Sequence, residues 1–315
     1  MKIVVVDAFT LNPGDLSWQK IESFGDVQLF DRTTGAELVE RCMDAEVILT
    51  NKVAFSRAVL EQLPNLKMIA VTATGFNIVD VEAASEKGIV VCNVPDYGTD
   101  SVAQHTFGFI LEIANQVGLH TTSVHKDEWL KSKDFSYALT PLIELRDTTL
   151  GLIGLGNIGK KTAEIAKAFG MKVIYHTPSK KETTIAEYRD LESIFKESDF
   201  VSLHLPLKAD NKEFVNKQLI GLMKSSAYLI NTSRGALINE KDLAEALNNG
   251  ILAGAALDVL SVEPPSLENP LLKAKNCIIT PHNAWMSKAA RIRIMEITYQ
   301  NIDSFNKGNI INKVS

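Results

Sequence analysis

The sequence predicts an α/β protein with two doubly wound parallel-sheet domains. Short apolar runs alternate with helical patterns along the chain, and this alternation is typical of parallel sheets with helices on both faces. The chain has 315 residues, which is enough for two domains of ordinary size. The series of strands starts again near Leu150, so we expect the same architecture to be used twice.

Strands are expected at the short apolar runs of each half. In the first half these runs cover residues 3–7, 27–30, 46–50, 68–74 and 89–93. In the second half they cover residues 150–155, 172–176, 200–205, 227–232, 253–258 and 277–280. Helical stretches lie between the runs, so neighbouring strands of each half would be parallel.

Two long helices are expected where the halves join. One begins near Thr99 or Asp100, either of which could cap it, and the other runs from about Ser287 to Ile302. Both helices are rich in apolar residues. This indicates either packing within one chain or a dimer interface, and we expect a homodimer.

The second long helix would return the chain to the first domain. We therefore expect a flavodoxin-like substrate domain at residues 1–98 and 286–315. A Rossmann nucleotide-binding domain at residues 99–285 would be inserted into it.

A glycine turn opens the second half, between an apolar strand and a helical pattern. Its sequence is Gly154-Leu155-Gly156-Asn157-Ile158-Gly159. The first glycine allows the tight turn, the second lets a pyrophosphate approach the backbone, and the third lets the helix pack on the strand. The helix N-terminus adds N–H groups and a partial positive charge. This context predicts a dinucleotide site at Gly154, Gly156, Asn157, Ile158 and Gly159.

Charge and composition argue against several classes of partner. The formal net charge is −5 and no stripe of Lys or Arg is present, so no nucleic-acid partner is expected. No apolar stretch approaches the roughly 20 residues of a membrane span. The three cysteines, Cys42, Cys92 and Cys277, are isolated and lack metal-ligand spacing. We therefore expect reduced thiols, a cytoplasmic protein and no metal site.

Three polar side chains follow predicted strands of the second half, at the edge where open α/β sheets bind ligands. They are Arg234, Glu263 and His282. Each alone has an ordinary explanation as a surface or packed residue. Beside a dinucleotide site, however, they form a complete set for reducing a 2-oxo acid. Arginine would hold the carboxylate and polarise the ketone, histidine would supply the proton, and glutamate would orient the histidine and favour its protonated form.

The chain resembles the D-isomer-specific 2-hydroxyacid dehydrogenases over nearly its whole length. The resemblance rests on four ordered motifs, which are the glycine turn, Asn231-Thr232-Ser233-Arg234-Gly235, Leu257-Asp258-Val259 with Glu263-Pro264-Pro265, and Thr280-Pro281-His282. Within the family it is most similar to the glycerate dehydrogenases (hydroxypyruvate reductases), at residues 7–18, 50–52, 73–77, 100–106, 141–145 and 282–285. It implies hydride transfer between NAD(P)H and a small 2-oxo acid. The expected reactions are reduction of hydroxypyruvate to D-glycerate and of glyoxylate to glycolate.

The resemblance also implies roles for individual residues. The catalytic residues would be Arg234, Glu263 and His282. The substrate would be bound by Lys52, Thr74, Gly75, Arg234 and His282. Besides the glycine turn, the cofactor would contact Thr106, Thr177, Thr232 and Asp258, the last of these at the nicotinamide carboxamide. For Lys52 a plain surface role, and for Thr106 a core role, are the alternative interpretations.

The choice of coenzyme stays open in the sequence. Thr177 stands where the family often carries an acidic residue that binds the ribose 2′-hydroxyl, and Lys180 and Lys181 follow it. A missing carboxylate and two nearby cations favour a 2′-phosphate. No arginine is present there to act as the usual phosphate fork. We expect NAD, with NADP as the alternative.

Two other functions are compatible with the motifs. One is D-3-phosphoglycerate dehydrogenase, many examples of which carry a C-terminal regulatory domain that we do not expect here. The other is a nucleotide-sensing protein similar to the transcriptional co-repressors that resemble this family. The absence of long disordered or basic tails argues against the second function.

Overall fold

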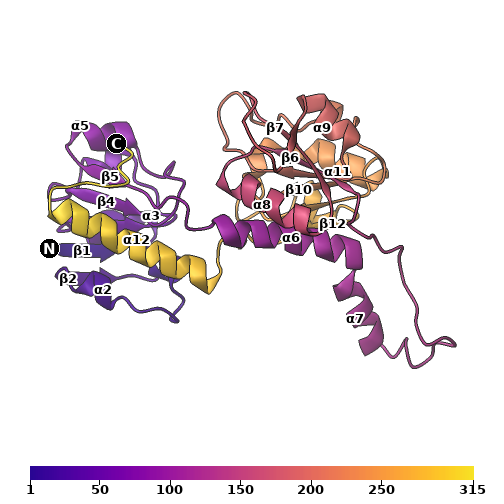
Figure 1. Cartoon of the computed structure of the whole chain (residues 1–315). Coiled ribbons are helices and arrows are strands. Elements are labelled where there is room, and N and C mark those ends of the chain that lie inside the picture. Colours follow the sequence, from indigo (N-terminus) through magenta and orange to yellow (C-terminus); the bar gives the residue numbers. More distant parts are fainter. The chain divides into compact units, whose positions relative to one another are not determined.

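The computed structural model describes all residues, 1–315. The chain divides into two compact units (Figure 1). Unit 1 comprises Met1–Gly98 and Met286–Ser315, and unit 2 comprises Thr99–Trp285. Unit 1 is therefore made of two separate stretches of chain.

Unit 1 contains a five-stranded parallel sheet with the order β2-β1-β3-β4-β5. This is the order of a flavodoxin-like sheet, as predicted. The strands are β1 (Lys2–Val5), β2 (Asp26–Leu29), β3 (Val47–Thr50), β4 (Met68–Val71) and β5 (Val90–Cys92). β3 and β4 are buried at every position, because helices cover both faces of the sheet.

The helices of unit 1 form two layers. They are α1 (Ala8–Leu11), α2 (Gln19–Glu22), α3 (Gly35–Cys42), α4 (Arg57–Leu60), α5 (Val81–Glu86) and α12 (Lys288–Asn306). One face of the sheet packs on residues of α3, α4 and α5, among them Leu38, Leu60 and Ala83. The other face packs on Ile21 of α2 and Ile302 of α12. The burial of Ile302 supports the packing interpretation for this helix, although Ile292 is half exposed.

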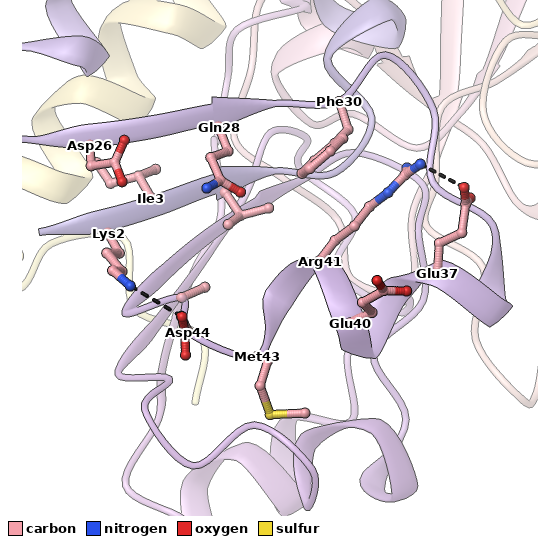
Figure 2. Close-up of a pocket in the computed structure, with 12 residues that line it drawn as sticks. Lys2, Ile3, Asp26, Gln28, Phe30, Glu37, Glu40, Arg41, Met43 and Asp44 are labelled. Carbon is pink, nitrogen blue, oxygen red and sulfur yellow. Dashed lines mark hydrogen bonds and ion pairs between the residues drawn. The ribbon is translucent and has the colours of Figure 1, made fainter.

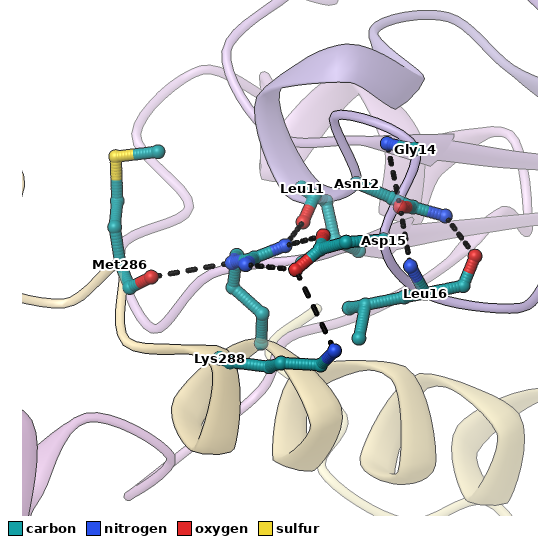
Figure 3. Close-up of polar contacts among 8 residues, drawn as sticks. Leu11, Asn12, Gly14, Asp15, Leu16, Met286 and Lys288 are labelled. Carbon is teal, nitrogen blue, oxygen red and sulfur yellow. Dashed lines mark hydrogen bonds and ion pairs between the residues drawn. The ribbon is translucent and has the colours of Figure 1, made fainter.

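The start of α12 is fixed by polar contacts. The Ser287 side chain accepts the N–H of Ala290, so the predicted helix start is confirmed. The guanidinium of Arg291 donates to both carboxylate oxygens of Asp15, at 2.6 and 2.8 Å, and to the carbonyl of Met286 at 3.2 Å (Figure 3). Asp15 belongs to the loop between α1 and α2, so this pair ties α12 to that loop.

The last residues complete the edge of the unit 1 sheet. Lys313 bridges to Cys92 at the end of β5, and the N–H of Val314 donates to the carbonyl of Val91 at 2.8 Å. The Arg293 side chain donates to the carbonyl of Tyr97 at 2.8 Å. The C-terminal stretch is therefore part of the fold of unit 1.

Unit 2 contains a seven-stranded parallel sheet with the order β12-β11-β10-β9-β6-β7-β8. Its strands are β6 (Thr149–Ile153), β7 (Lys172–His176), β8 (Glu187–Tyr188), β9 (Phe200–Leu203), β10 (Tyr228–Asn231), β11 (Gly254–Leu257) and β12 (Cys277–Ile279). This is the Rossmann arrangement, with the order reversing between β6 and β9. The predicted fold class is confirmed. β8 was not predicted, because two residues at a sheet edge carry no alternating apolar pattern.

The helices of unit 2 are α6 (Thr99–Asn115), α7 (Val117–His125), α8 (Asn157–Ala168), α9 (Leu191–Glu197), α10 (Lys217–Ile220) and α11 (Glu240–Asn248), with short 3₁₀ turns η1 (Gly235–Leu237) and η2 (Pro270–Lys273). α6 includes both Thr99 and Asp100 in its first turn. It packs against α8, and Phe107, Phe109 and Ile110 are buried in the core. These residues support the packing interpretation for α6.

Apolar side chains are exposed on α7 and the chain that follows it, which we call the arm (residues 117–143). Figure 1 shows the arm extending away from the sheet of unit 2. Phe135 is 90% exposed and Leu130 is 85% exposed. Further exposed apolar residues of the arm are Val117, Leu119, Val124, Trp129, Leu139 and Leu142. None of the helices in the structure combines the length and the apolar character that a membrane crossing demands.

Candidate active site

Gly154 and Gly159 allow the close packing of the glycine turn. Gly154 directly follows β6 and has a φ of +101°, and a Cβ atom there would overlap the carbonyl oxygen of His204. A Cβ atom on Gly159 would overlap the carbonyl oxygen of Gly154. Both positions therefore require glycine, the first for conformation and space and the second for space alone.

Gly156 has a different environment, which fits a dinucleotide. A Cβ atom there would meet no atom within 4 Å, so the turn leaves open space beside the backbone. Gly156 also precedes the twelve residues of α8, and no side chain caps this helix. An uncapped helix N-terminus next to open backbone is the arrangement that binds a pyrophosphate. The residues present fit the dinucleotide that the sequence predicts.

Thr177 follows β7, where the adenosine ribose is bound in this fold. Its side chain is buried and donates to the carbonyl of Ser179 at 2.7 Å. The hydroxyl of Tyr175 donates to the carbonyl of Lys181 and accepts the N–H of the same residue. This fold-back brings the Lys181 ammonium to the carbonyl oxygen of Leu155 in the glycine turn, at 3.0 Å. Lys181 forms no ion pair with a carboxylate.

His204 was not among the predicted site residues, although it directly follows a strand and touches the glycine turn. Its imidazole is buried, and Nε2 lies 2.9 Å from the hydroxyl of Ser202. Nδ1 has no hydrogen-bond partner. Burial lowers the pKa of His204 from 6.5 to about 4, so the ring is neutral at pH 7.

This burial predicts a specific loss of stability in acid. Above pH 6.5 His204 is neutral in both the folded and the unfolded chain, and it adds no pH dependence. Below pH 6.5 the unfolded chain takes up the proton first, because the folded pKa is about 4. The free energy of unfolding should therefore fall by about 2 kcal/mol between pH 8 and pH 5 from this group alone. Urea unfolding of the protein at the two pH values measures the loss.

The control for this measurement is a pair of variants. His204→Asn should lose about 2 kcal/mol less than the parent between the two pH values. His125→Asn alters an exposed imidazole at the end of α7 and should keep the parental pH dependence. Equal pH dependence in all three proteins would show that His204 is not buried as a neutral ring.

Arg234 follows β10 in a loop that Asn231 braces. The fully buried amide of Asn231 accepts the N–H of Ser233 at 2.9 Å and donates to the carbonyl of Arg234 at 2.9 Å. The Arg234 guanidinium is exposed, and its one hydrogen bond goes to the carbonyl of Ser233 at 2.7 Å. A Cβ atom on Gly235 would overlap the backbone of Leu260, so this glycine lets the arginine loop lie against the loop that leads to Glu263.

His282 and Glu263 form a hydrogen-bonded pair. The imidazole Nδ1 lies 2.6 Å from Oε2 of Glu263, and the other oxygen of Glu263 accepts the N–H of Leu260 at 3.0 Å. Both side chains are partly exposed, at 27% for His282 and 35% for Glu263. The carboxylate therefore fixes the ring through Nδ1 and leaves Nε2 as the nitrogen that can reach a ligand.

Asp258 holds the loop that carries His282. Its buried carboxylate accepts the hydroxyl of Thr280 at 2.5 Å and the N–H groups of Asn283 and Ala284, both at 2.9 Å. Its carbonyl accepts the N–H of His282 at 2.8 Å. These bonds hold His282 at a φ of +51°, a conformation that a histidine rarely adopts. The position of His282 is thus fixed by the buried aspartate.

The remaining predicted cofactor residues lie close to β10. Thr232 follows β10 directly, and its hydroxyl lies 3.1 Å from the hydroxyl of Thr106 on α6. Thr106 has no exposed surface, and its hydroxyl also donates to the carbonyl of Val102. Its contacts are those of a core residue that positions Thr232.

The predicted substrate residues of unit 1 lie at the carboxyl ends of β3 and β4. Lys52 is exposed and follows β3. Thr74 donates to the carbonyl of Val94 at 2.9 Å, and Gly75 follows it in the loop after β4. Parallel strands place these loops at one edge of the sheet, where ligands bind in open α/β folds.

A surface hollow in unit 1 lies elsewhere, between β1, β2 and α3 (Figure 2). It is lined by two cations, Lys2 and Arg41, and four carboxylates, Asp26, Glu37, Glu40 and Asp44. Lys2 pairs with Asp44 at 3.2 Å and Arg41 pairs with Glu37 at 2.6 Å. None of the predicted site residues lines it.

The comparisons with known proteins agree with these observations. Residues 107–284 match the model of the D-isomer specific 2-hydroxyacid dehydrogenase NAD binding domain. The chain is 44% identical over 321 residues to a hydroxypyruvate reductase of Blautia hydrogenotrophica, with 100% of each chain covered. It is 39% identical over 283 residues to a glycerate dehydrogenase of Methylorubrum extorquens, with 89% of each covered.

A solved structure of a dehydrogenase has a similar fold. The apo structure of D-lactate dehydrogenase from Escherichia coli is similar with a TM-score of 0.86 and 30% identity, and 100% of each chain is covered. The family model and the full-length relatives agree with the fold and with the glycine turn described above. The chain belongs to the D-isomer-specific 2-hydroxyacid dehydrogenase family.

Proposed function

We propose that this protein is an NAD(P)H-dependent reductase of small 2-oxo acids, with hydroxypyruvate as its main substrate and glyoxylate as a second one. The products would be D-glycerate and glycolate. The observation that carries the proposal is the bond between His282 and Glu263 in a unit that also holds an open glycine turn. The names of two relatives, a hydroxypyruvate reductase and a glycerate dehydrogenase, support hydroxypyruvate as the substrate.

Each residue of the predicted set has a distinct task in this reaction. The coenzyme, when bound, supplies a hydride to C2 of the substrate. Arg234 would bind the substrate carboxylate and polarise the ketone through its fork of donors. His282 would give the proton at Nε2 to the ketone oxygen. Glu263 would hold the ring at Nδ1 and balance its charge before the proton is transferred.

The two units would have separate roles. Unit 2 would bind the coenzyme through the glycine turn, Thr177, Thr232 and Asp258. Thr106 would hold Thr232 in position through the contact between their hydroxyl groups. Unit 1 would be the substrate domain, and Lys52, Thr74 and Gly75 would contact the substrate carboxylate or hydroxyl. This role is supported by the polar residues Lys52 and Thr74, which lie in the loops after β3 and β4.

The coenzyme is proposed to be NAD, with NADP also accepted. No arginine follows β7 to act as a phosphate fork. Thr177, however, brings no negative charge, and the Lys181 ammonium lies 3.0 Å from the carbonyl oxygen of Leu155 in the glycine turn. In a Rossmann fold the adenosine ribose binds between this turn and the end of the second strand. We propose that Lys181 would bind the 2′-phosphate when the coenzyme is NADP.

Replacing this lysine should separate the two coenzymes. Lys181→Met should raise the dissociation constant of NADPH about tenfold, because one charge-assisted bond to phosphate is lost. The dissociation constant of NADH should stay within about twofold. Coenzyme fluorescence titration measures both. Lys172→Met, which alters an exposed lysine at the start of β7, is the matched control and should leave both values unchanged. Equal weakening of NADH and NADPH by Lys181→Met would refute the assignment.

Two chains are proposed to form a homodimer in the cytoplasm. The exposed apolar residues of the arm, such as Phe135 and Leu130, are the surface that a second copy would cover. All three cysteines are free, in accordance with a reducing compartment. Sedimentation should give about twice the chain mass of 34.6 kDa.

A steady-state panel tests the proposed reaction. Hydroxypyruvate, glyoxylate, pyruvate and 3-phosphohydroxypyruvate are each assayed with NADH and with NADPH. The proposal predicts the highest kcat/KM for hydroxypyruvate. A higher value for 3-phosphohydroxypyruvate would favour a phosphoglycerate dehydrogenase, and slow turnover of every acid with tight NADH binding would favour a nucleotide sensor.

A further inference from the structure

A buried carboxylate lies under the loop that carries Lys52. Asp7 follows β1 and is 6% exposed. Its two oxygens accept the backbone N–H of Asn51 at 2.9 and 3.0 Å, and Oδ2 also accepts the N–H groups of Lys52 at 2.6 Å and Val53 at 3.2 Å. Three successive N–H groups thus converge on one carboxylate.

Asn51 extends this contact to the next strand. Its amide nitrogen donates to the carbonyl of Thr72 at 2.7 Å and lies 3.1 Å from the Thr72 hydroxyl. Asn51 and Thr72 are both buried, and Thr72 precedes the loop that holds Thr74. The Asp7 network (Asp7, Asn51 and Thr72) therefore connects the carboxyl ends of β1, β3 and β4.

The Asp7 network places a carboxylate in the protein interior, which costs free energy of folding. Burying a carboxylate is unfavourable, and burial raises the pKa of Asp7 even against the three N–H donors that lower it. The fold of the sheet does not need a charge here, since its core is apolar on both faces. What Asp7 does determine is the backbone path from Asn51 to Val53, and so the point from which the exposed Lys52 side chain starts.

We propose that Asp7 is a positioning residue for substrate binding, which acts by holding the Lys52 loop in the geometry that contacts a 2-oxo acid. This inference rests on the proposed function. Asp7 itself touches no substrate, and it is distinct from Arg234, Glu263 and His282. The sequence shows it only as an aspartate that ends an apolar run, so its role depends on contacts with residues 44 to 46 positions away.

The test compares Asp7→Asn with the parent protein. Asparagine has only one side-chain acceptor oxygen, so it cannot accept all of the N–H groups that Asp7 accepts. Its NH₂ group would face some of these N–H donors and would disturb the Lys52 loop. The KM for hydroxypyruvate should rise about tenfold, because one aligned polar contact to a charged substrate is lost. The kcat should stay within about threefold and the NADH dissociation constant within about twofold, since neither chemistry nor coenzyme depends on this loop. Asp26→Asn changes an exposed carboxylate on β2 and should leave all three constants unchanged.

A double-mutant cycle separates positioning from a merely structural role. If Asp7 acts through Lys52, the KM of Asp7→Asn with Lys52→Met should equal that of Lys52→Met alone. Should Asp7→Asn fail to fold, Thr72→Val removes one acceptor of Asn51 and should raise the KM in the same direction, while Thr72→Ser restores it. Additive effects in the cycle, or lower kcat with unchanged KM, would overturn the inference.

The two proposals fail in different ways. A parent protein that does not reduce hydroxypyruvate with either coenzyme refutes the proposed function. A parent protein that reduces it, with Asp7→Asn indistinguishable from Asp26→Asn in KM, refutes only the role of Asp7.

Discussion

His282→Ala should lower the turnover of hydroxypyruvate by about 10²- to 10⁴-fold, because the proton that meets the ketone oxygen would have no positioned donor. The imidazole is fixed at Nδ1 by the 2.6 Å bond to Glu263, and alanine removes both the donor and that contact. The dissociation constant of NADH should stay within about twofold, since the glycine turn is unaltered. Stopped-flow measurement of the hydride step, together with coenzyme titration, gives both quantities.

Two further variants make this result specific. Glu263→Gln keeps a hydrogen-bonding group at the same place but removes its charge. Its turnover of hydroxypyruvate should therefore fall by less than that of His282→Ala. His125→Ala removes an exposed histidine of the same unit and should leave turnover unchanged. If His282→Ala retained parental turnover, another residue would have to supply the proton.

Arg234→Met should reduce kcat/KM for hydroxypyruvate by about 10²- to 10⁴-fold, because two charge-assisted bonds to the carboxylate are lost together. In the structure the guanidinium is exposed and bonded only to the carbonyl of Ser233, so its other donors are available for a ligand. Steady-state kinetics over a wide range of substrate concentrations would show the loss.

The matched comparison uses other arginine variants. Arg234→Lys keeps the charge but not the planar fork, and its kcat/KM should lie between those of the parent and Arg234→Met. Arg146→Met alters a side chain that is 77% exposed and should behave as the parent. Weaker coenzyme binding with unchanged substrate kinetics in Arg234→Met would place Arg234 at the coenzyme instead.

The sequence predicts both sheets because their strands are short apolar runs, and this pattern survives into the structure. The strand ends are less accurate, for physical reasons. The run 150–155 stops at Ile153 because Gly154 turns the chain with a φ of +101°. The run 68–74 stops at Val71, and beyond it the carbonyl of Ala73 accepts a single bond from the N–H of Val94, two residues past the end of β5.

The sequence predicts candidate site residues but not the contacts that hold them in position. Motifs single out Arg234, Glu263 and His282, whereas the bonds that position them join segments distant in sequence. Asp258 holds Asn283 and Ala284 from 25 and 26 positions away. Such contacts depend on the register between β11 and β12, which no local pattern encodes. The exposed apolar residues of the arm were missed for the same reason, since exposure is decided by what packs on a segment.

The divided composition of unit 1 has a consequence for synthesis of the chain. Residues 1–98 of unit 1 are translated before unit 2. The other part of unit 1, with α12 and the residues that pair with β5, is translated after unit 2. Until then the sheet face of Ile3, Val5 and Leu49 lacks the Ile302 that packs against it. All of unit 2 has been translated before Met286, so it can fold while unit 1 still waits with apolar surface exposed to chaperones.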